Sequence, residues 1–255
     1  MISKAKATKI LSLLFISIGL VVILFPPVSN KVGEKIFESR IQEFENSKNK
    51  VIDNGKSCKD NPTEDNTVTA IYKIDLDRLY DDSVKYNDSL KTNQREYLKG
   101  ESSDNGVALN LTDYGIYNGV YGYISAPTIN MQLPIYLGAS NYNMSQGAAH
   151  ITYTSLPLGG DSTNTVLAAH SGYIGRLFFD NIIHLSVGDT VSVTTYWDTL
   201  NYTVSNCKIS KNYESSDCYI EAGKDKLTLI TCISDGHGDF NRYYVICDRI
   251  TAAVE

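Results

Sequence analysis

The sequence predicts a mainly β protein, an eight-stranded closed barrel with short helices and an N-terminal helical appendage. Its 255 residues are enough for one globular domain plus extra segments. The chain has 18 Tyr but only 7 Phe, together with many Thr and Val, which is typical of strands whose tyrosine rings are half buried. From Gly119 onward, short apolar runs alternate with turn signals, and closing such strands into a barrel leaves no exposed sheet edge.

Residues 119–255 are therefore predicted to form the barrel. Each strand is expected where a short run of β-branched and aromatic residues is bounded by turn residues. One helical interruption is expected at Arg176–Ile183. The predicted strands are Val120–Ala126, Met131–Leu137, Ala148–Ile151, Thr165–Ala169, Thr190–Trp197, Tyr202–Ile209, Lys226–Thr231 and Arg242–Ile250.

The first thirty residues differ in kind from the barrel. Lys4, Lys6 and Lys9 precede Ile10–Phe25, which carries no charge, and the prolines at 26–27 are expected to end this run. The run is a little short of the ~20 residues of a membrane-spanning helix, but Ala7 and Val28 extend it. A cleaved signal peptide is the alternative, but no small-x-small cleavage site follows. We therefore expect residues 1–30 to be an uncleaved signal-anchor in the cell membrane, with the lysines in the cytoplasm and the barrel outside the cell.

Residues 31–118 are predicted to be a helical stalk followed by a linker. Apolar side chains recur at near-helical spacing in residues 31–53 and again in residues 74–97. Residues 54–66 have the composition of a loop. Residues 98–118 are rich in Gly, Ser, Asp and Asn, and we expect them to form a mobile linker.

Composition excludes some functions. The net charge is −6, and no basic run occurs in the body of the chain, so nucleic-acid binding is not expected. The five cysteines form no Cys-x-x-Cys pair and no His cluster accompanies them, so no metal site is expected. No cofactor is expected either. Cys207 and Cys218 flank a loop that they could bridge, whereas Cys247 is expected to be a small buried hydrophobe.

Three residue types needed for covalent acyl transfer each stand at the end of a predicted strand. Cys232 ends the apolar run 226–231, His170 follows the run 165–169, and Arg242 opens the last strand, beyond a loop that can bring it near the thiol. A thiolate can attack a carbonyl, an imidazole can move the protons, and a guanidinium can stabilise the oxyanion. These three are the candidate catalytic residues.

Neighbouring residues are candidates for substrate binding. Thr231 and Ala169 directly precede Cys232 and His170, and we expect both to contact the substrate. Thr231 could instead pack as an ordinary β-branched strand residue. His237 is the rival base because it is close to Cys232 in sequence, although a Gly-flanked histidine is more often a surface residue. Structural or solvated roles are expected for His150, His184, Arg176, Asp235 and Asp239, and parity puts Arg249 on the opposite face of the last strand from Arg242.

These residues together resemble a sortase. The resemblance lies in Thr228-Leu-Ile-Thr-Cys, in His170 after an apolar strand and in Arg242 opening the final strand. Finer blocks are most similar to class C, the pilin-polymerising group: Leu133-Pro-Ile-Tyr-Leu-Gly, Gly147-Ala-Ala-His-Ile-Thr-Tyr-Thr-Ser-Leu-Pro-Leu-Gly-Gly, Ala169-His-Ser-Gly, Leu177-Phe-Phe-Asp and Gly223-Lys-Asp.

The resemblance implies a sortase-type barrel on the outer face of a Gram-positive membrane. It implies cleavage of a Leu-Pro-x-Thr-Gly sorting signal, borne by surface or pilin proteins, between Thr and Gly. Cys232 would form a thioester with the Thr carbonyl, and an amine would resolve it: a pilin lysine in class C, or a peptidoglycan cross-bridge in the anchoring classes. His170 would be the general acid and base, and Arg242 would hold the oxyanion or the signal backbone.

Two features differ from the class C pattern. Class C enzymes usually carry an Asp-Pro-aromatic lid ahead of the barrel, and this sequence has no Asp-Pro pair. A lid could instead be built from Leu98–Tyr117. The second membrane span and basic tail common in class C do not follow the last strand here. Alternatives to a class C sortase are a housekeeping or other anchoring sortase, a hydrolytic cysteine protease, and a surface-exposed β-barrel binding protein with an inactive site.

Overall fold

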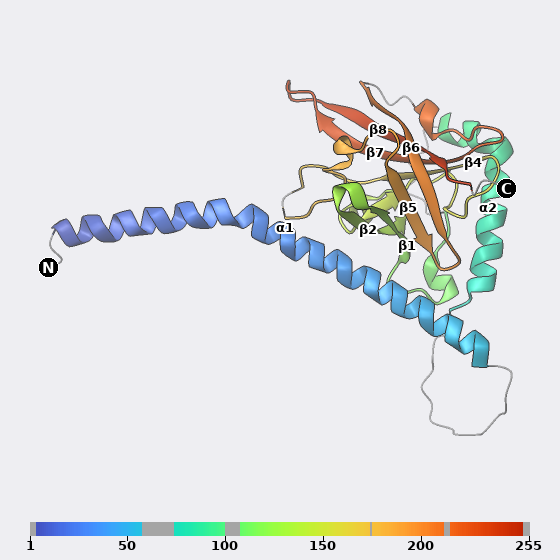
Figure 1. The fold of residues 1–255 in the computed structure, drawn as a ribbon, viewed down its shortest axis with the longest axis horizontal. Coiled ribbons are helices and arrows are strands. Elements are labelled where there is room, and N and C mark those ends of the chain that lie inside the picture. The colour runs from blue at the N-terminus through green and yellow to red at the C-terminus, as the bar shows by residue number, and fades with distance from the viewer. Residues whose placement is uncertain (1–3, 58–73, 100–107, 174, 212–214, 252–255) are drawn as a thin grey trace.

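The computed structural model describes residues 4–57, 74–99, 108–173, 175–211 and 215–251. Eight strands close into a barrel in the order β1-β2-β3-β4-β7-β8-β6-β5, which confirms the predicted fold class (Figure 1). The pairs β2–β3 and β4–β7 are parallel, and the other pairs are antiparallel. The strands are β1 (Val120–Ala126), β2 (Met131–Leu137), β3 (Ala148–His150), β4 (Thr163–Ala168), β5 (Thr190–Thr195), β6 (Thr199–Ser210), β7 (Asp225–Ser234) and β8 (Phe240–Arg249).

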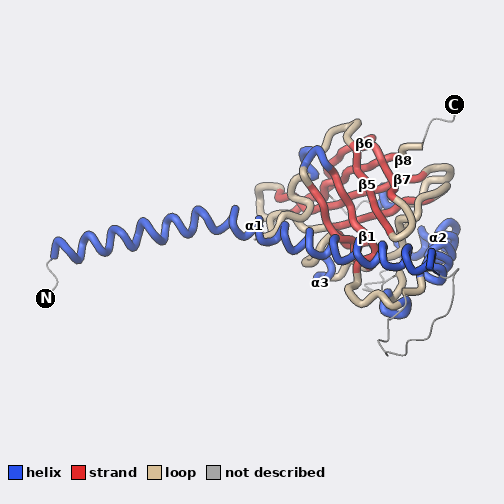
Figure 2. Tube along the Cα trace, turned by 60° about the horizontal axis from the view of Figure 1, so that its bottom comes forward, coloured by secondary structure: helices blue, strands red, loops and turns tan. Residues whose placement is uncertain are grey.

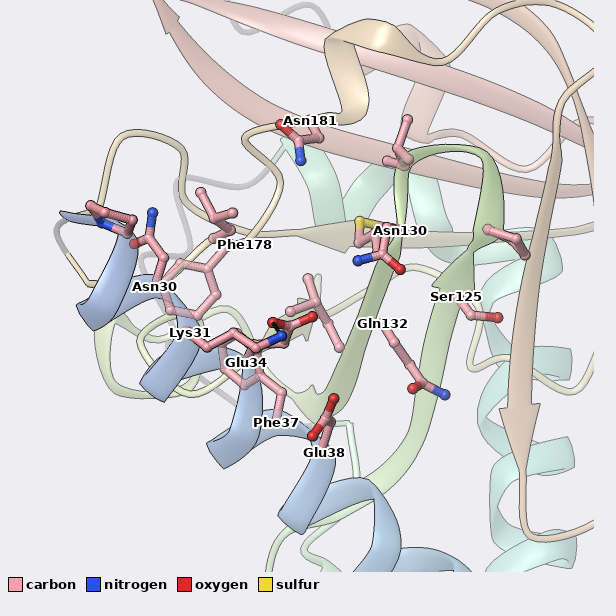
Figure 3. A pocket seen from close by; sticks show the side chains of 16 residues that line it. Asn30, Lys31, Glu34, Phe37, Glu38, Ser125, Asn130, Gln132, Phe178 and Asn181 are labelled. Carbon is pink, nitrogen blue, oxygen red and sulfur yellow. Dashed lines mark hydrogen bonds and ion pairs between the residues drawn. The ribbon is translucent and has the colours of Figure 1, made fainter. Parts of the chain in front are cut away.

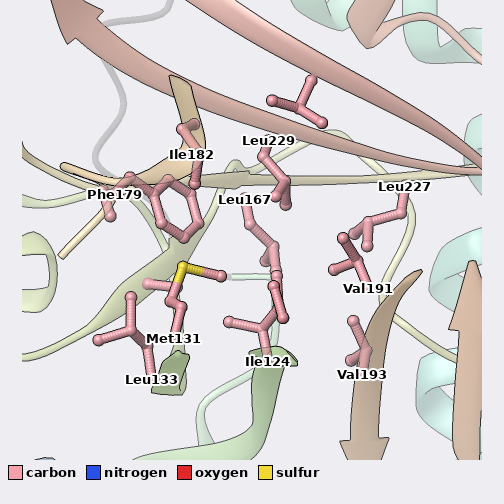
Figure 4. Close-up of a cluster of buried hydrophobic side chains, with 14 of the residues drawn as sticks. Ile124, Met131, Leu133, Leu167, Phe179, Ile182, Val191, Val193, Leu227 and Leu229 are labelled. Atoms are coloured by element: carbon pink, nitrogen blue, oxygen red, sulfur yellow. The ribbon is translucent and has the colours of Figure 1, made fainter. Parts of the chain in front are cut away.

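Inward-facing side chains fill the barrel. Leu227 and Leu229 of β7 meet Leu167 of β4 and Ile124 of β1 in this core (Figure 4). Because successive side chains of a strand point to opposite faces, the alternate residues of β7 face outward. Ile230 accordingly packs in a separate cluster outside the barrel core. This parity places the side chain of Cys232 on the outer face of the barrel.

The long helix α1 (Lys4–Ser57) is continuous through Pro26 and Pro27, so the predicted break at these prolines is wrong. A proline removes one backbone donor and tends to bend a helix, but tertiary packing can maintain the helix beyond it. Here Phe37, Ile41 and Phe44 are all buried against the barrel. Figures 1 and 2 show the C-terminal half of α1 running along the barrel while its N-terminal half projects away from it.

The amphipathic helix predicted around residues 74–97 is α2 (Leu76–Lys99). Its buried face is partly polar: Asn87 donates to the carbonyl of Leu156 at 3.0 Å and accepts from its amide at 2.7 Å. Gln94 binds the backbone of Tyr153 and Cys218 in a similar way. Both helices therefore pack on the barrel and do not stand off it as a stalk, and the domain boundary at residue 119 stays a prediction.

Short helices occupy several connections. α3 (Asn141–Met144) was not predicted, and 3₁₀ turns form at Leu111–Tyr114, Pro127–Ile129, Ile182–His184 and Ser215–Cys218. The helix predicted at Arg176–Ile183 is wrong except for the turn at its end. The carboxylate of Asp180 accepts from the amides of Gly172 at 2.6 Å and Phe178 at 2.8 Å, which folds this segment into a compact loop.

One buried histidine gives the barrel a dependence on pH. His150 is 0% exposed, and its Nε2 lies 3.0 Å from the carbonyl of Thr154, which fixes the proton on that nitrogen. Nδ1 is buried without a partner among the described residues. Protonating the ring would add a second N–H with no acceptor, and burial lowers the pKa of His150 to about 4.

We expect stability to fall in acid as a result. The unfolded chain takes up this proton near pH 6.5 and the folded chain only near pH 4, so this contribution is complete above pH 6.5 and is lost as the pH falls towards 4. It amounts to about 3 kcal/mol of unfolding free energy. Urea unfolding between pH 7.5 and 4.5 measures the loss. An NMR titration that gave folded His150 an ordinary pKa would contradict the explanation, and His184→Gln, at an exposed histidine, should leave the loss unchanged.

Candidate active site

Cys232 and Arg242 face each other across the β7–β8 hairpin. The two residues are direct partners in the antiparallel ladder, and directly opposed side chains on one face of a sheet lie in contact. Arg242 Nη1 donates to Cys232 Sγ at 2.8 Å. Both strands are longer than predicted, because pairing continues to Ser234 and Phe240. The ladder itself, and not a folded-back loop, therefore brings the guanidinium to the thiol.

His170 reaches the same edge through the parallel pair β4–β7. Ala168 is level with Ile230 in this ladder, so His170, two residues later, comes out level with Cys232. Parallel strands end at the same edge of a sheet, which is why two strand-terminal residues far apart in sequence meet here. The structure thus brings together the three predicted catalytic residues.

Two hydroxyl groups join the strands where the backbone ladder ends. Thr231 Oγ1 donates to the carbonyl of Ala169 at 2.8 Å, and Ser171 Oγ donates to the carbonyl of Cys232. Thr231 and Ala169, predicted to bind substrate, are only 2% and 4% exposed. They lie beneath the site with the Thr231 hydroxyl already engaged, so direct contact with a substrate would require this bond to break. Ser171 lies in the Ala169-His-Ser-Gly block, but the sequence analysis assigned it no role of its own.

A cavity of about 650 Å³ lies over Cys232, His170 and Arg242. Arg242 and Lys211 contribute positive charge to its wall, and Asp239 contributes a carboxylate. The rival base His237 is not among the lining residues and is exposed on the hairpin turn. The lining residues are His170, Ser171, Lys211, Cys232, Asp239, Phe240 and Arg242.

Asp235 has the turn role expected of it. Its carboxylate accepts from the amides of His237 at 2.7 Å and Asp239 at 3.1 Å, and these hydrogen bonds lower the pKa of the Asp235 carboxyl group. Glycines with positive φ at 236 and 238 permit this tight connection. The compact turn fixes the end of the hairpin that carries Cys232 and Arg242.

The imidazole of His170 is surrounded by aromatic rings. The ring of Tyr173 stacks on it, with centroids 5.6 Å apart and an interplanar angle of 17°, and Phe178 meets it edge-on at 6.2 Å. Among the described residues, these ring contacts orient the imidazole, whereas an Asp does so in the Ser-His-Asp triad. The sequence analysis did not single out Tyr173, and it named Phe178 only within the Leu177-Phe-Phe-Asp block, without a contact to His170.

The other arginines and cysteines have separate surroundings. Arg176 was predicted to be a solvated helix charge, but Nη1 donates to the carbonyl of Ser145 at 2.6 Å. The possible bridge between Cys207 and Cys218 is not formed, since both are free thiols. Cys218 is buried, and burial raises its pKa to about 12. Cys247 is a buried core residue as expected, and Cys58 lies outside the described residues.

Metal ligation is not supported by the part of the chain that the structure describes. No group of three or more His, Cys, Asp or Glu side chains is arranged there to hold an ion. The site instead combines a thiol, an imidazole and a guanidinium around one accessible cavity. This set can form a covalent bond to a carbonyl carbon, move a proton and stabilise negative charge on oxygen.

Comparison with known proteins shows a similarity to one family. A family profile described as "Sortase domain" matches residues 124–250. Sortase A of Bacillus anthracis is 28% identical over 131 residues, which cover 51% of this chain and 60% of that relative, so the match spans less than two thirds of the curated protein.

Solved structures extend the similarity over most of the chain. The "Pilus-related Sortase C of Group B Streptococcus" is 31% identical, with a TM-score of 0.59 and coverage of 69% of this chain and 90% of that one. Sortase C-1 from Streptococcus pneumoniae is 26% identical, with a TM-score of 0.64 and coverage of 84% and 99%. Since the fold, the matched profile and this level of identity agree, the chain belongs to the sortase family.

Proposed function

We propose that this protein is a cysteine transpeptidase that cleaves a Leu-Pro-x-Thr-Gly-type sorting signal and transfers the acyl group to an amine. The observation that carries the proposal is the Arg242 Nη1 to Cys232 Sγ contact of 2.8 Å, at an edge where His170 lies level with Cys232 in the strand register. A guanidinium donating to the sulfur stabilises negative charge there, and a thiolate is the reactive form of a cysteine.

The chemistry proceeds in two balanced halves. Cys232 Sγ bonds to the Thr carbonyl carbon, the Thr–Gly C–N bond breaks, and the imidazolium of His170 gives its proton to the leaving amine. The incoming amine then attacks the thioester, the imidazole takes the proton of that amine, and the sulfur leaves as the thiolate. Arg242 would donate to the oxyanion in both halves.

A class C function, in which the acceptor is a pilin lysine, is the favoured form of this proposal. Its support is the similarity to a structure named as a pilus-related sortase C. The lid expected from Leu98–Tyr117 falls partly outside the described residues. In its described part, Leu111, Tyr114 and Ile116 pack with Leu79 of α2, in a cluster distinct from the barrel core. These three residues do not line the cavity over Cys232.

The N-terminal half of α1 is the proposed membrane anchor. Among the described residues, one helix segment is long and apolar enough to cross a membrane: Lys9–Val51 of α1, whose most apolar window has a mean hydropathy of 2.5 and is not buried within the protein. Its apolar side chains are open to the surroundings, from Ile10 at 58% to Phe25 at 57% exposed. With Lys4, Lys6 and Lys9 on the cytoplasmic side, the barrel would lie outside the cell.

Product analysis tests the proposed function. The full chain in detergent is incubated with a peptide containing Leu-Pro-x-Thr-Gly, with and without a lysine-containing acceptor peptide or a cross-bridge amine, and the products are identified by mass spectrometry. We expect cleavage after Thr and a new amide when the right amine is present. Release of only the free acid at every amine concentration would point to a hydrolytic protease, and no cleavage would contradict the proposal.

A further inference from the structure

The helix α1 approaches the segment that follows His170 closely at Gly33. A Cβ added at Gly33 would lie 2.6 Å from the carbonyl oxygen of Gly175 and 2.9 Å from Cγ of Arg176. Glycine is among the least favourable residues in a helix interior, but here any larger residue would push the two segments apart. α1 and the segment that follows His170 therefore lie too close at this point to accept a side chain without a shift.

One turn further along α1, an aromatic ring continues this contact. Phe37 is 4% exposed, and its ring lies 5.4 Å from the ring of Phe178 (Figure 3). Phe178, itself 2% exposed, meets the rings of both His170 at 6.2 Å and Tyr173 at 5.5 Å. A continuous series of ring contacts therefore runs from α1 to both rings of the His170–Tyr173 stack.

Removing the ring of Phe37 would take away one of the ring contacts that hold Phe178 in place. Phe178 belongs to the barrel core cluster, and Phe37 is the residue of α1 in that cluster. Beside these two rings, a cavity of about 720 Å³ separates α1 from β1 and β2 (Figure 3). Space is therefore available into which Phe178 could move, and the imidazole that rests on it could turn with it.

We propose that α1 positions the imidazole of His170 through Gly33 and Phe37, so that the helix predicted to leave the membrane is part of the active-site support. The inference rests on the proposed function for the role of His170. Phe37 and Phe178 are positioning residues, since they touch the imidazole or its neighbour and not the reacting atoms. A change in the way α1 docks on the barrel would therefore change the orientation of the His170 imidazole.

The kinetic test is Phe37→Ala in the full chain. A misplaced acid–base group costs about 10- to 100-fold in rate, so we expect kcat to fall by that factor while KM changes less than twofold. Phe37→Leu, which refills most of the space, should recover most of the activity. The matched control is Phe44→Ala, seven residues along the same helix, where the ring is 0% exposed and packs on Tyr196 at 4.5 Å, in a different cluster.

A second pair of variants tests the close approach. Gly33→Ala improves the helix propensity of α1 but forces the His170 segment away, so we expect kcat to fall. Gly19→Ala makes the same chemical change where an added Cβ has nothing within 4 Å, and its kcat should match that of the wild type.

An NMR measurement keeps the inference testable without a substrate. With histidine-selective labelling, Phe37→Ala and Gly33→Ala should shift the imidazole signals of His170 and leave those of His237 in place, whereas Phe44→Ala should leave both in place. These shifts would support the positioning role even if no sorting peptide were cleaved. Unchanged His170 signals in folded Phe37→Ala and Gly33→Ala, or equal kinetic losses in Phe37→Ala and Phe44→Ala, would overturn it.

Discussion

Replacing Cys232 by Ala is expected to reduce turnover of the sorting peptide to background, a fall of about 10⁶-fold, since removal of the nucleophile of a covalent enzyme has an effect of that size. The side chain lines the cavity, lies on the outer face of β7 and forms part of no buried cluster. Its loss should therefore leave the fold intact, and peptide cleavage followed by chromatography measures the result.

Cys207→Ala is the matched control for this loss. Cys207 is a half-buried free thiol on β6, with Sγ 3.6 Å from the carbonyl of Leu185, and it does not line the cavity. We expect activity within twofold of the wild type. A Cys232→Ala variant that still cleaved the peptide, or a Cys207→Ala variant that lost activity while remaining folded, would show that the wrong thiol has been assigned.

Arg242→Ala should lower kcat/KM by about 10²- to 10³-fold, the usual effect of losing one donor to a developing oxyanion. The variant removes both the donor 2.8 Å from the sulfur and a positive charge of the cavity wall. Arg242→Lys should retain part of the activity, because an ammonium keeps the charge but lacks the planar fork of a guanidinium. Steady-state kinetics with the sorting peptide provide the comparison.

Arg249→Ala controls for the general loss of an arginine from β8. Arg249 lies near the other end of the strand, where Nε is 3.8 Å from the carboxylate of Asp225, and it does not line the cavity. Its replacement should affect stability and leave kcat/KM within twofold. If Arg242→Ala and Arg249→Ala had equal kinetic effects, the proposed role of Arg242 at the reacting atoms would be wrong.

Much of the barrel could be predicted from the sequence because each strand carries its own local signal. The predicted bounds of β1 and β2 agree with the structure, and all eight predicted strands are present. The convergence of Cys232, His170 and Arg242 could be inferred because the strand ends carry these residues. Their register could not, since it depends on pairing between residues distant in sequence, such as Ala168 with Ile230.

The errors lie where tertiary contacts decide local structure. Prolines 26–27 predicted a helix end, but α1 continues through them and packs on the barrel beyond them. Nothing in the sequence around Asp180 indicated that its carboxylate accepts hydrogen bonds from two backbone amides. These bonds hold the segment as a loop where a helix was predicted. The contacts of Tyr173 and Phe178 with His170 were not predicted for a similar reason. The sequence around a phenylalanine in an apolar run does not indicate which residue its ring will contact in the fold.

In our proposal the position of the His170 imidazole depends on how α1 docks on the barrel, and the sequence motifs do not show this. The predicted membrane segment and the ring series that reaches His170 belong to one continuous helix. An isolated barrel that begins at residue 119 would lack Phe37 as well as the proposed anchor. We therefore expect a chain that begins at or before residue 31 to retain the site. A chain that begins after residue 37 should lose the contact by which Phe37 holds Phe178.

The acyl-enzyme itself provides the most direct test of the central claim. The full chain is mixed with the sorting peptide, quenched in acid within the first turnover and measured as the intact protein, then digested to locate the adduct. We predict an added mass equal to the peptide up to its Thr less one water, carried by Cys232 and released by hydroxylamine. Product formation with no adduct at any time point, or with an adduct on another residue, would contradict the assignment of Cys232 as the nucleophile.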